Sequence, residues 1–91
     1  MSEKKYIVKV SHKAEKMIKK IPQREKILFR ALIIDLEESG PYRTEWPNYS
    51  SLGKDQYHCH LSYHWVACWT WEKGSIIIEV YYAGSRQKAP Y

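Results

Sequence analysis

The spacing of apolar residues changes near Gly40-Pro41, and that change constrains the fold most strongly. Over residues 11–38 apolar side chains recur at helical spacing, whereas after Gln56 they gather in short β-rich runs. Pro22 divides the helical part in two, and Gly40-Pro41 ends the second helix. Ser11 stands where an N-cap belongs. The sequence therefore predicts two amphipathic helices followed by strands.

Four β-rich runs surround these helices, at residues 6–10, 56–61, 65–71 and 75–83, and residues 41–56 are predicted to be a loop. The tight turn Glu72-Lys73-Gly74 favours a hairpin between the last two. The order β-α-α-β-β-β predicts an α+β fold, in which an antiparallel sheet carries the helical hairpin on one face and leaves the other face free for a ligand. A chain of 91 residues suits one such domain, spanning residues 1–91.

Positive charge is concentrated in the first third of the chain. The formal net charge is +5; residues 1–30 hold ten Lys and Arg against three Glu, and residues 31–91 hold five basic and seven acidic side chains. A basic surface on a small domain indicates a polyanionic partner, but it also fits a solvated helix face with surplus lysine. Charge alone leaves both interpretations open.

Cysteine content and hydropathy indicate the compartment. Cys59 and Cys68 are too few for the disulfide framework of a small secreted protein. The N-terminal sequence MSEKKYIVKV has no apolar signal-peptide core, and no apolar run approaches membrane-spanning length. We expect a cytoplasmic protein with reduced thiols and no membrane partner.

Three of the four histidines lie in one stretch, YHCHLSYHW, at residues 57–65. Side chains of a strand alternate between its two faces, so Cys59 and Leu61 share one face and His58 and His60 share the other. Cys59 and Leu61 suit the side covered by helices. We therefore expect His58 and His60 on the open face of the sheet.

Histidine and cysteine are also zinc ligands, so a metal site competes with an acid–base site here. The alternation turns Cys59 away from its neighbouring histidines, and neither a CxxC pair nor a helical HxxxH spacing occurs. We expect no metal and no other cofactor. A site made of His58, His60 and His64 stays open as an alternative, as does a set of merely exposed histidines.

Two segments, CHLSYHW at 59–65 and VYYAGSRQKAPY at 80–91, together with the order of elements, resemble the RelE/ParE toxin superfamily. The closest similarity is to its mRNA interferases of the RelE and YafQ type. In YafQ-type toxins a histidine opens the turn, and an acidic residue followed by Trp starts the next strand. His60 matches that histidine and Trp65 the tryptophan, while His64 replaces the acid.

The second segment is similar to the last strand and tail of the family, where a Gly is followed by an Arg or His and then by an aromatic residue. Gly84, Arg86 and Tyr91 occupy these positions. Compared with RelE itself, His58 and His60 stand where paired lysines occur. His64 stands where the next strand begins with an arginine.

The resemblance implies the toxin of a type II toxin–antitoxin system, acting as a metal-independent endoribonuclease on mRNA held in the ribosomal A site. A ribose 2′-OH would attack the adjacent phosphate, which requires a general base, a general acid and positive charge on the transition state. Histidine suits the first two roles because its ordinary pKa is near 6.5. The expected catalytic residues are His60, His64, Arg86 and Tyr91. The expected RNA-binding residues are Lys54, His58, Lys88, Lys13, Lys16 and Lys20.

The resemblance also implies partners: a cognate antitoxin protein, mRNA, and the ribosome with its 16S rRNA. Members of the ParE type have the same fold but inhibit DNA gyrase and need no histidine cluster. A ParE-like gyrase inhibitor and a non-catalytic nucleic-acid- or protein-binding module are therefore the alternatives. The histidine cluster favours the nuclease.

Overall fold

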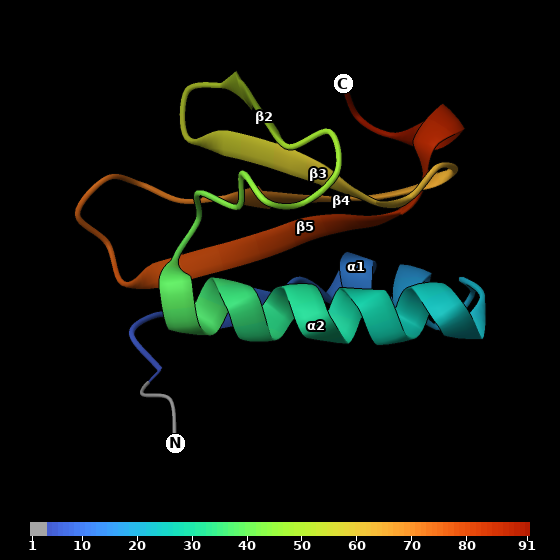
Figure 1. Ribbon diagram of the computed structural model, residues 1–91, viewed down its shortest axis with the longest axis horizontal. Helices are drawn as coiled ribbons and strands as arrows, with labels where there is room; N and C mark the ends of the chain where they lie inside the picture. The colour runs from blue at the N-terminus through green and yellow to red at the C-terminus, as the bar shows by residue number, and fades with distance from the viewer. Residues whose placement is uncertain (1–3) are drawn as a thin grey trace.

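The computed structural model describes residues 4–91, so residues 1–3 of the predicted domain lie outside the described residues (Figure 1). Within residues 4–91, five strands form one sheet in the order β1-β5-β4-β3-β2. The elements, in chain order, are β1 (Ile7–Val10), α1 (His12–Ile18), α2 (Gln23–Ser39), β2 (Ser50–Gly53), β3 (Gln56–Ser62), β4 (Trp65–Thr70), β5 (Ile77–Ser85) and the short 3-10 helix η1 (Arg86–Lys88). The α+β class and the predicted order of helices and main strands are confirmed.

The sheet is mixed, which corrects the prediction of an antiparallel sheet. β1 runs parallel to β5, with Ile7 opposite Ile77 and Val10 opposite Val80, whereas the other three strand pairs are antiparallel. Parallel neighbours need a long connection between them, and here both helices and three strands intervene. The alternation of residues along a strand carries no information about the direction of its partner, so the sequence could not reveal this pairing.

Strand β2 lies inside the segment that was predicted to be a loop. Its sequence SSLG offers a single apolar side chain, and glycine is rare in strands. It is ordered by its partner instead: Ser50 lies opposite His58 and Ser51 opposite Tyr57 on β3. The strand next to the histidines therefore comes from a segment with no strand signal of its own.

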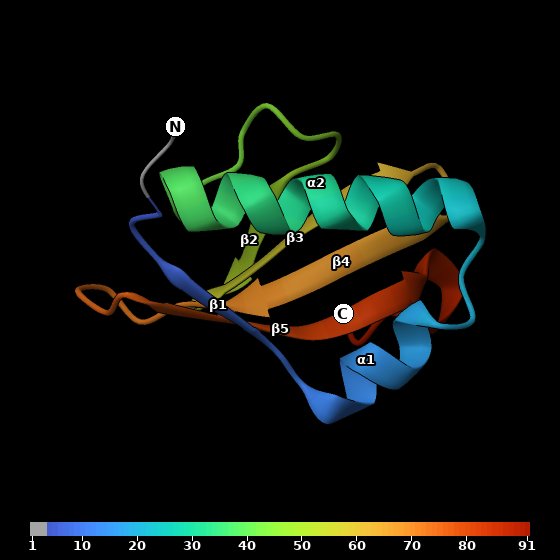
Figure 2. The same ribbon diagram turned by 90° about the horizontal axis from the view of Figure 1, so that it is seen from below.

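The two helices occupy different places on the sheet. Figure 2 shows α2 lying across one face and α1 beside the second half of β5. Leu32 and Leu36 of α2 are fully buried against that face. β1 ends at the pair Val10–Val80, so residues 81–85 of β5 have no strand on that side, and α1 packs there. The predicted cap of α1 is confirmed, because the Ala14 N–H donates to Ser11 Oγ over 3.1 Å.

The sheet buries apolar side chains on both faces. Cys59, Leu61, Trp69 and Val80 belong to the cluster under α2, and a smaller cluster on the opposite face contains Val66, Cys68 and Tyr82. The register of β4 and β5 shifts at one point, because Cys68 lies opposite Tyr82 but Trp69 lies opposite Val80. The extra residue, Tyr81, therefore packs with Tyr82 in the smaller cluster.

Two further expectations can be compared with this part of the chain. Cys59 and Cys68 are free, buried thiols. Across residues 4–91, no helix combines the length and apolar character needed to cross a membrane.

Helix α2 ends at Gly40, and we predict that Gly40→Ala destabilises the fold. Gly40 has φ 94° and ψ −172°, a conformation open essentially only to glycine, and a Cβ there would lie 2.9 Å from Cε1 of Tyr6. The backbone conformation alone costs about 1–3 kcal/mol for another residue. Urea unfolding monitored by circular dichroism should show a loss of at least this size.

Gly74→Ala is the matched control, because Gly74 also has φ 94° but nothing lies within 4 Å of a Cβ built there. We expect Gly74→Ala to cost less than Gly40→Ala, and the difference measures the clash with Tyr6. Equal losses would show that the Tyr6 ring moves aside freely.

Candidate functional site

His58 and His60 of β3 lie on the sheet face away from α2, as the alternation predicts. Their neighbours Cys59 and Leu61 are buried in the cluster under α2. The two imidazole rings are 5.9 Å apart between centroids, with an angle of 61° between their planes. Oγ of Ser50, on the adjacent strand β2, lies 3.1 Å from Nδ1 of His58 and holds that ring in place.

This face is not open, which corrects the prediction. After η1 the C-terminal tail folds back over the sheet toward β2 and β3 (Figure 1). The centroids of the Tyr91 and His58 rings are 4.5 Å apart, and Ala89 packs on the cluster that contains Cys68. His58 and His60 are each only 7% exposed. Strand alternation identifies the face of a side chain, but it cannot show that a distant tail covers that face.

His64 and Arg86 form a second group at the turn between β3 and β4. The Arg86 backbone N–H donates to the His64 carbonyl oxygen over 2.7 Å. The guanidinium of Arg86 lies 5.2 Å from the centroid of the Tyr63 ring, within cation–π range, and the Tyr63 and His64 rings are in edge contact at 4.7 Å. Together with Gln87 these residues line a cavity of about 410 Å³. The turn therefore holds a cation beside an exposed imidazole.

Electrostatics link the two groups. Burial lowers the pKa of His60, and the neighbouring His58 and the positive charge of Arg86 lower it further. Burial also lowers the pKa of His58. Burial raises the pKa of Tyr91, whereas Arg86 acts in the opposite direction. At neutral pH the site therefore combines two neutral imidazoles and a neutral phenol with a fixed positive charge.

The predicted RNA-binding lysines are divided between two ends of the molecule. Lys88 follows Arg86 in η1 and shares a cavity with Lys20, while Lys13 and Lys16 are exposed on α1. Lys54 is not part of this group. It lies in the turn between β2 and β3, before Gln56, and Gln56 is about 13 Å from His60 along the strand at 3.3 Å per residue.

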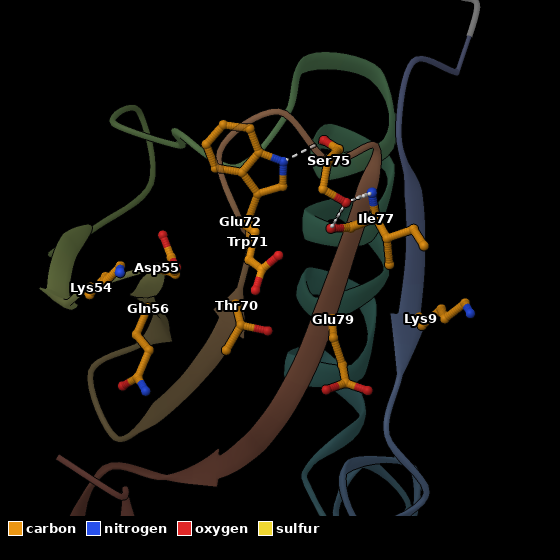
Figure 3. Close-up of a pocket in the computed structure, with 10 residues that line it drawn as sticks. All are labelled: Lys9, Lys54, Asp55, Gln56, Thr70, Trp71, Glu72, Ser75, Ile77 and Glu79. Atoms are coloured by element: carbon orange, nitrogen blue, oxygen red, sulfur yellow. Dashed lines mark hydrogen bonds between the residues drawn. The ribbon is translucent and has the colours of Figure 1, made fainter.

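Lys54 instead lines a different cavity, of about 500 Å³, at the other end of the sheet (Figure 3). In that view Lys9 and Lys54 lie on opposite sides of the cavity. Three carboxylates, of Asp55, Glu72 and Glu79, also line it. Because the acidic groups outnumber the two lysines, this cavity does not favour a phosphate group.

The described residues offer no cluster of metal ligands: within 4–91, no three side chains of His, Cys, Asp or Glu come close enough to hold an ion. His58, His60 and His64 thus do not form the three-histidine site that the sequence left open. Burial raises the pKa of Cys59 far above its usual range and that of Cys68 to about 12. Both thiols are protonated at neutral pH, whereas metals bind the thiolate.

Sequence reasoning missed Ser50 and Tyr63. No sequence pattern indicated Ser50, because its role depends on the unpredicted strand β2 and on the register that places Ser50 opposite His58. A sequence signal for Tyr63 did exist, because a large aromatic residue in the short turn beside His64 has no core to pack into. In the structure Tyr63 is exposed. Such a residue is available to hold a cation or a base.

Comparison with known proteins identifies the fold. No protein-family model and no curated protein matches the sequence. Among solved structures, the archaeal RelE–RelB complex from Pyrococcus horikoshii OT3 matches at 17% identity and TM-score 0.73, over 93% of this chain and 99% of that chain. The E. coli DinJ–YafQ toxin–antitoxin complex matches at 12% identity and TM-score 0.77, over 96% and 99%.

A metal-bound toxin from Helicobacter pylori matches at 19% identity and TM-score 0.68, over 91% of this chain and 97% of that chain. These similarities extend over nearly the whole described chain. The protein therefore has a RelE-like toxin fold, which confirms the fold implied by the two sequence segments.

We predict that the buried histidines make the protein less stable in mild acid. Burial lowers the pKa of His58 and His60 below 6.5 in the folded state, so the unfolded chain takes up protons first as the pH falls. The free energy of unfolding should therefore decrease as the pH drops below about 6.5 and level off below the folded-state pKa values. Urea unfolding between pH 7.5 and 5 measures this, and NMR titration of the two rings gives the pKa values directly. A pKa above 6.5 for both rings would contradict the prediction.

Proposed function

We propose that this protein is the toxin of a type II toxin–antitoxin system and that it cleaves messenger RNA by acid–base chemistry. The observation that carries the proposal is the gathering of His58, His60 and Tyr91 on the sheet face away from α2, with Arg86 and His64 at the adjoining turn between β3 and β4. The RelE-like fold supports it, because the structures with that fold include toxin–antitoxin complexes.

His60 is suited to act as the general base. Its lowered pKa keeps the imidazole neutral at pH 7, so a ring nitrogen can accept the proton of the ribose 2′-OH as its oxygen attacks the adjacent phosphorus. The bond from phosphorus to the 5′-oxygen then breaks, and that oxygen takes a proton. His64 is the second member of the pair: it is exposed at the turn and would act as the general acid.

Arg86 supplies the positive charge that the transition state requires. Its backbone is fixed to His64, and its guanidinium can clamp two phosphate oxygens through its planar fork. The charge that builds on the phosphorus oxygens is then stabilised by a group already in position, and its position costs no rearrangement during the reaction.

Tyr91 is suited to hold a base of the RNA. One side of its ring rests near His58, yet 54% of the residue remains exposed, so the other side can stack on a nucleobase. His58 would then serve to support Tyr91, and Ser50 would fix His58. An mRNA held by the ribosome would meet the tail of the toxin first and the buried histidines behind it.

The basic side chains beside this site would bind the ribosome. Lys13, Lys16 and Lys20 come from the region of α1, and Lys88 is two residues from Arg86. Phosphates of the mRNA and of the 16S rRNA are their expected partners. Lys54 lies at the other end of the sheet beside three carboxylates, so it is not part of this proposed RNA-binding group. The site of action would be the cytoplasm, and a cognate antitoxin would restrain the enzyme.

We predict that His60→Ala and Arg86→Ala each slow the cleavage of ribosome-bound mRNA by at least about a hundredfold, the usual loss when a positioned acid–base group is removed. Arg86→Lys should recover only part of the activity, because a lysine keeps the charge but loses the bidentate fork. Primer extension on mRNA in a purified translation system measures the rate and locates the cuts.

Lys73→Ala is the control, since Lys73 is exposed in the turn between β4 and β5, far along the sheet from Arg86. It should cleave like the unmodified protein. Cleavage by His60→Ala at the unmodified rate would refute the assignment of the base. Intact mRNA together with inhibited DNA supercoiling would instead establish the gyrase-inhibitor alternative.

Binding to ribosomes should weaken steeply with salt, and the double variant Lys13→Ala/Lys16→Ala should reduce that dependence. Each lost phosphate contact lowers the slope of log affinity against log salt by about one. Sedimentation with ribosomes at several salt concentrations gives the slope, with Lys73→Ala again as the control. A slope that stays the same in the double variant would show that α1 does not contact RNA phosphates.

A further inference from the structure

A cavity between α1 and the end of β5, which we call the α1–β5 pocket, has no role in the chemistry above. Its volume is about 250 Å³. Met17, Ile21, Trp65 and Tyr82 give it mainly apolar walls, and the exposed side chains of Lys20 and Lys88 also line it. The pocket is therefore apolar inside and positively charged at its opening.

The pocket depends on the absence of a side chain at Gly84. A Cβ at this position would lie 3.1 Å from Oη of Tyr82 and 3.2 Å from Cε of Met17, both of which belong to the pocket walls. Tyr82 cannot easily turn away, because its hydroxyl donates to the Ser85 carbonyl oxygen over 2.7 Å. An alanine here would crowd the walls and reduce the space between them.

The size and the walls of the pocket indicate one apolar side chain as its occupant. Cavities that hold drug-sized ligands measure about 300–1,000 Å³, so this one is small for a separate molecule. A nucleobase would require an open aromatic face to stack on, but Tyr82 is only 6% exposed and Trp65 packs against the main core. Because the lysines at the opening attract carboxylates, the partner segment that carries the apolar side chain should be acidic.

We propose that the α1–β5 pocket anchors an acidic segment of a partner protein, which inserts one apolar side chain and pairs its carboxylates with Lys20 and Lys88. A buried apolar anchor surrounded by charged contacts is a common source of affinity in protein interfaces. The identification of that partner as the antitoxin rests on the proposed function. The pocket and its preference for an acidic segment do not.

The position of the pocket gives such a partner control over the RNA site. Ser85 lines the pocket and directly precedes Arg86, and its Oγ accepts a hydrogen bond from the Lys88 backbone N–H over 3.3 Å. The bound segment would therefore lie next to the guanidinium that clamps the phosphate. Lys20 and Lys88 cannot pair with carboxylates and RNA phosphates at once, so the partner and the RNA exclude each other.

Two synthetic peptides test the proposal on the full chain: a nonapeptide with four glutamates on each side of a central leucine, and the same peptide with a central serine. In nitrogen-15 NMR spectra the leucine peptide should shift the amides of Gly84 and Ser85 and the indole N–H of Trp65. Burial of one leucine is worth about 1.5–3 kcal/mol, so it should bind at least about tenfold more tightly than the serine peptide.

Protein variants separate the two parts of the interaction. Lys20→Ala/Lys88→Ala should weaken both peptides, Gly84→Ala should reduce the preference for leucine, and Lys73→Ala should change neither. Equal affinity for the two peptides would overturn the proposal, as would shifts confined to other surfaces. Shifts of the pocket signals by an oligouridylate, without any by the peptides, would overturn it in favour of an RNA subsite. The binding test needs no cleavage, so failure of the ribonuclease assignment and failure of the pocket are distinguishable.

Discussion

The pairing of β4 with β5 is the interaction on which the rest of the structure depends. It runs from Trp65 opposite Ser85 to Thr70 opposite Glu79, in the middle of the sheet. β5 also pairs with β1 and packs against α1, so the two ends of the chain meet on this strand. Because the strand ends opposite Trp65, its next residue, Arg86, reaches the turn that carries His64. The location of the positive charge is thus a consequence of strand register.

The same strand shows how a bulge changes the surface that it presents. The extra residue near Tyr81 brings two consecutive tyrosines to the face that carries the histidines. Cys68 lies opposite His58 on β4 and Tyr82 lies opposite Cys68 on β5, so neutral side chains neighbour His58 on this face. The ring of Tyr91, in the tail, lies against His58 as well. An imidazole in such surroundings loses solvation when it is charged, which is why both histidine pKa values fall. Neutral imidazoles and a fixed cation can coexist here because His58 and His60 are buried whereas Arg86 is exposed.

Patterns within short stretches of the sequence were sufficient to predict the ends of the helices and the faces of the strands. Ser11, Pro22 and Gly40-Pro41 located the helix ends to within a few residues, and alternation placed Cys59 and His58 on the correct faces. The failures concern contacts between residues far apart in the chain, or a segment without strand propensity. These are the parallel pairing of β1 with β5, the ordering of β2 by β3, and the return of Tyr91 to His58. None of these leaves a periodic signal, because each depends on a partner more than thirty residues away or on a segment without strand propensity.

The candidate site follows the same division. The sequence predicted most of its residues, and the structure brings Arg86 to His64 and Tyr91 to His58. Lys54, however, lines a different cavity, and Ser50, which was not predicted, contacts His58. This has a consequence for how the site would be regulated. Arg86 and Lys88, which would bind RNA phosphates, follow directly after β5, and Gly84, Ser85 and Lys88 form one wall of the α1–β5 pocket. Under the proposed function, a ligand at either place would contact residues between 84 and 88, so binding at one place would affect binding at the other without any large movement of the sheet.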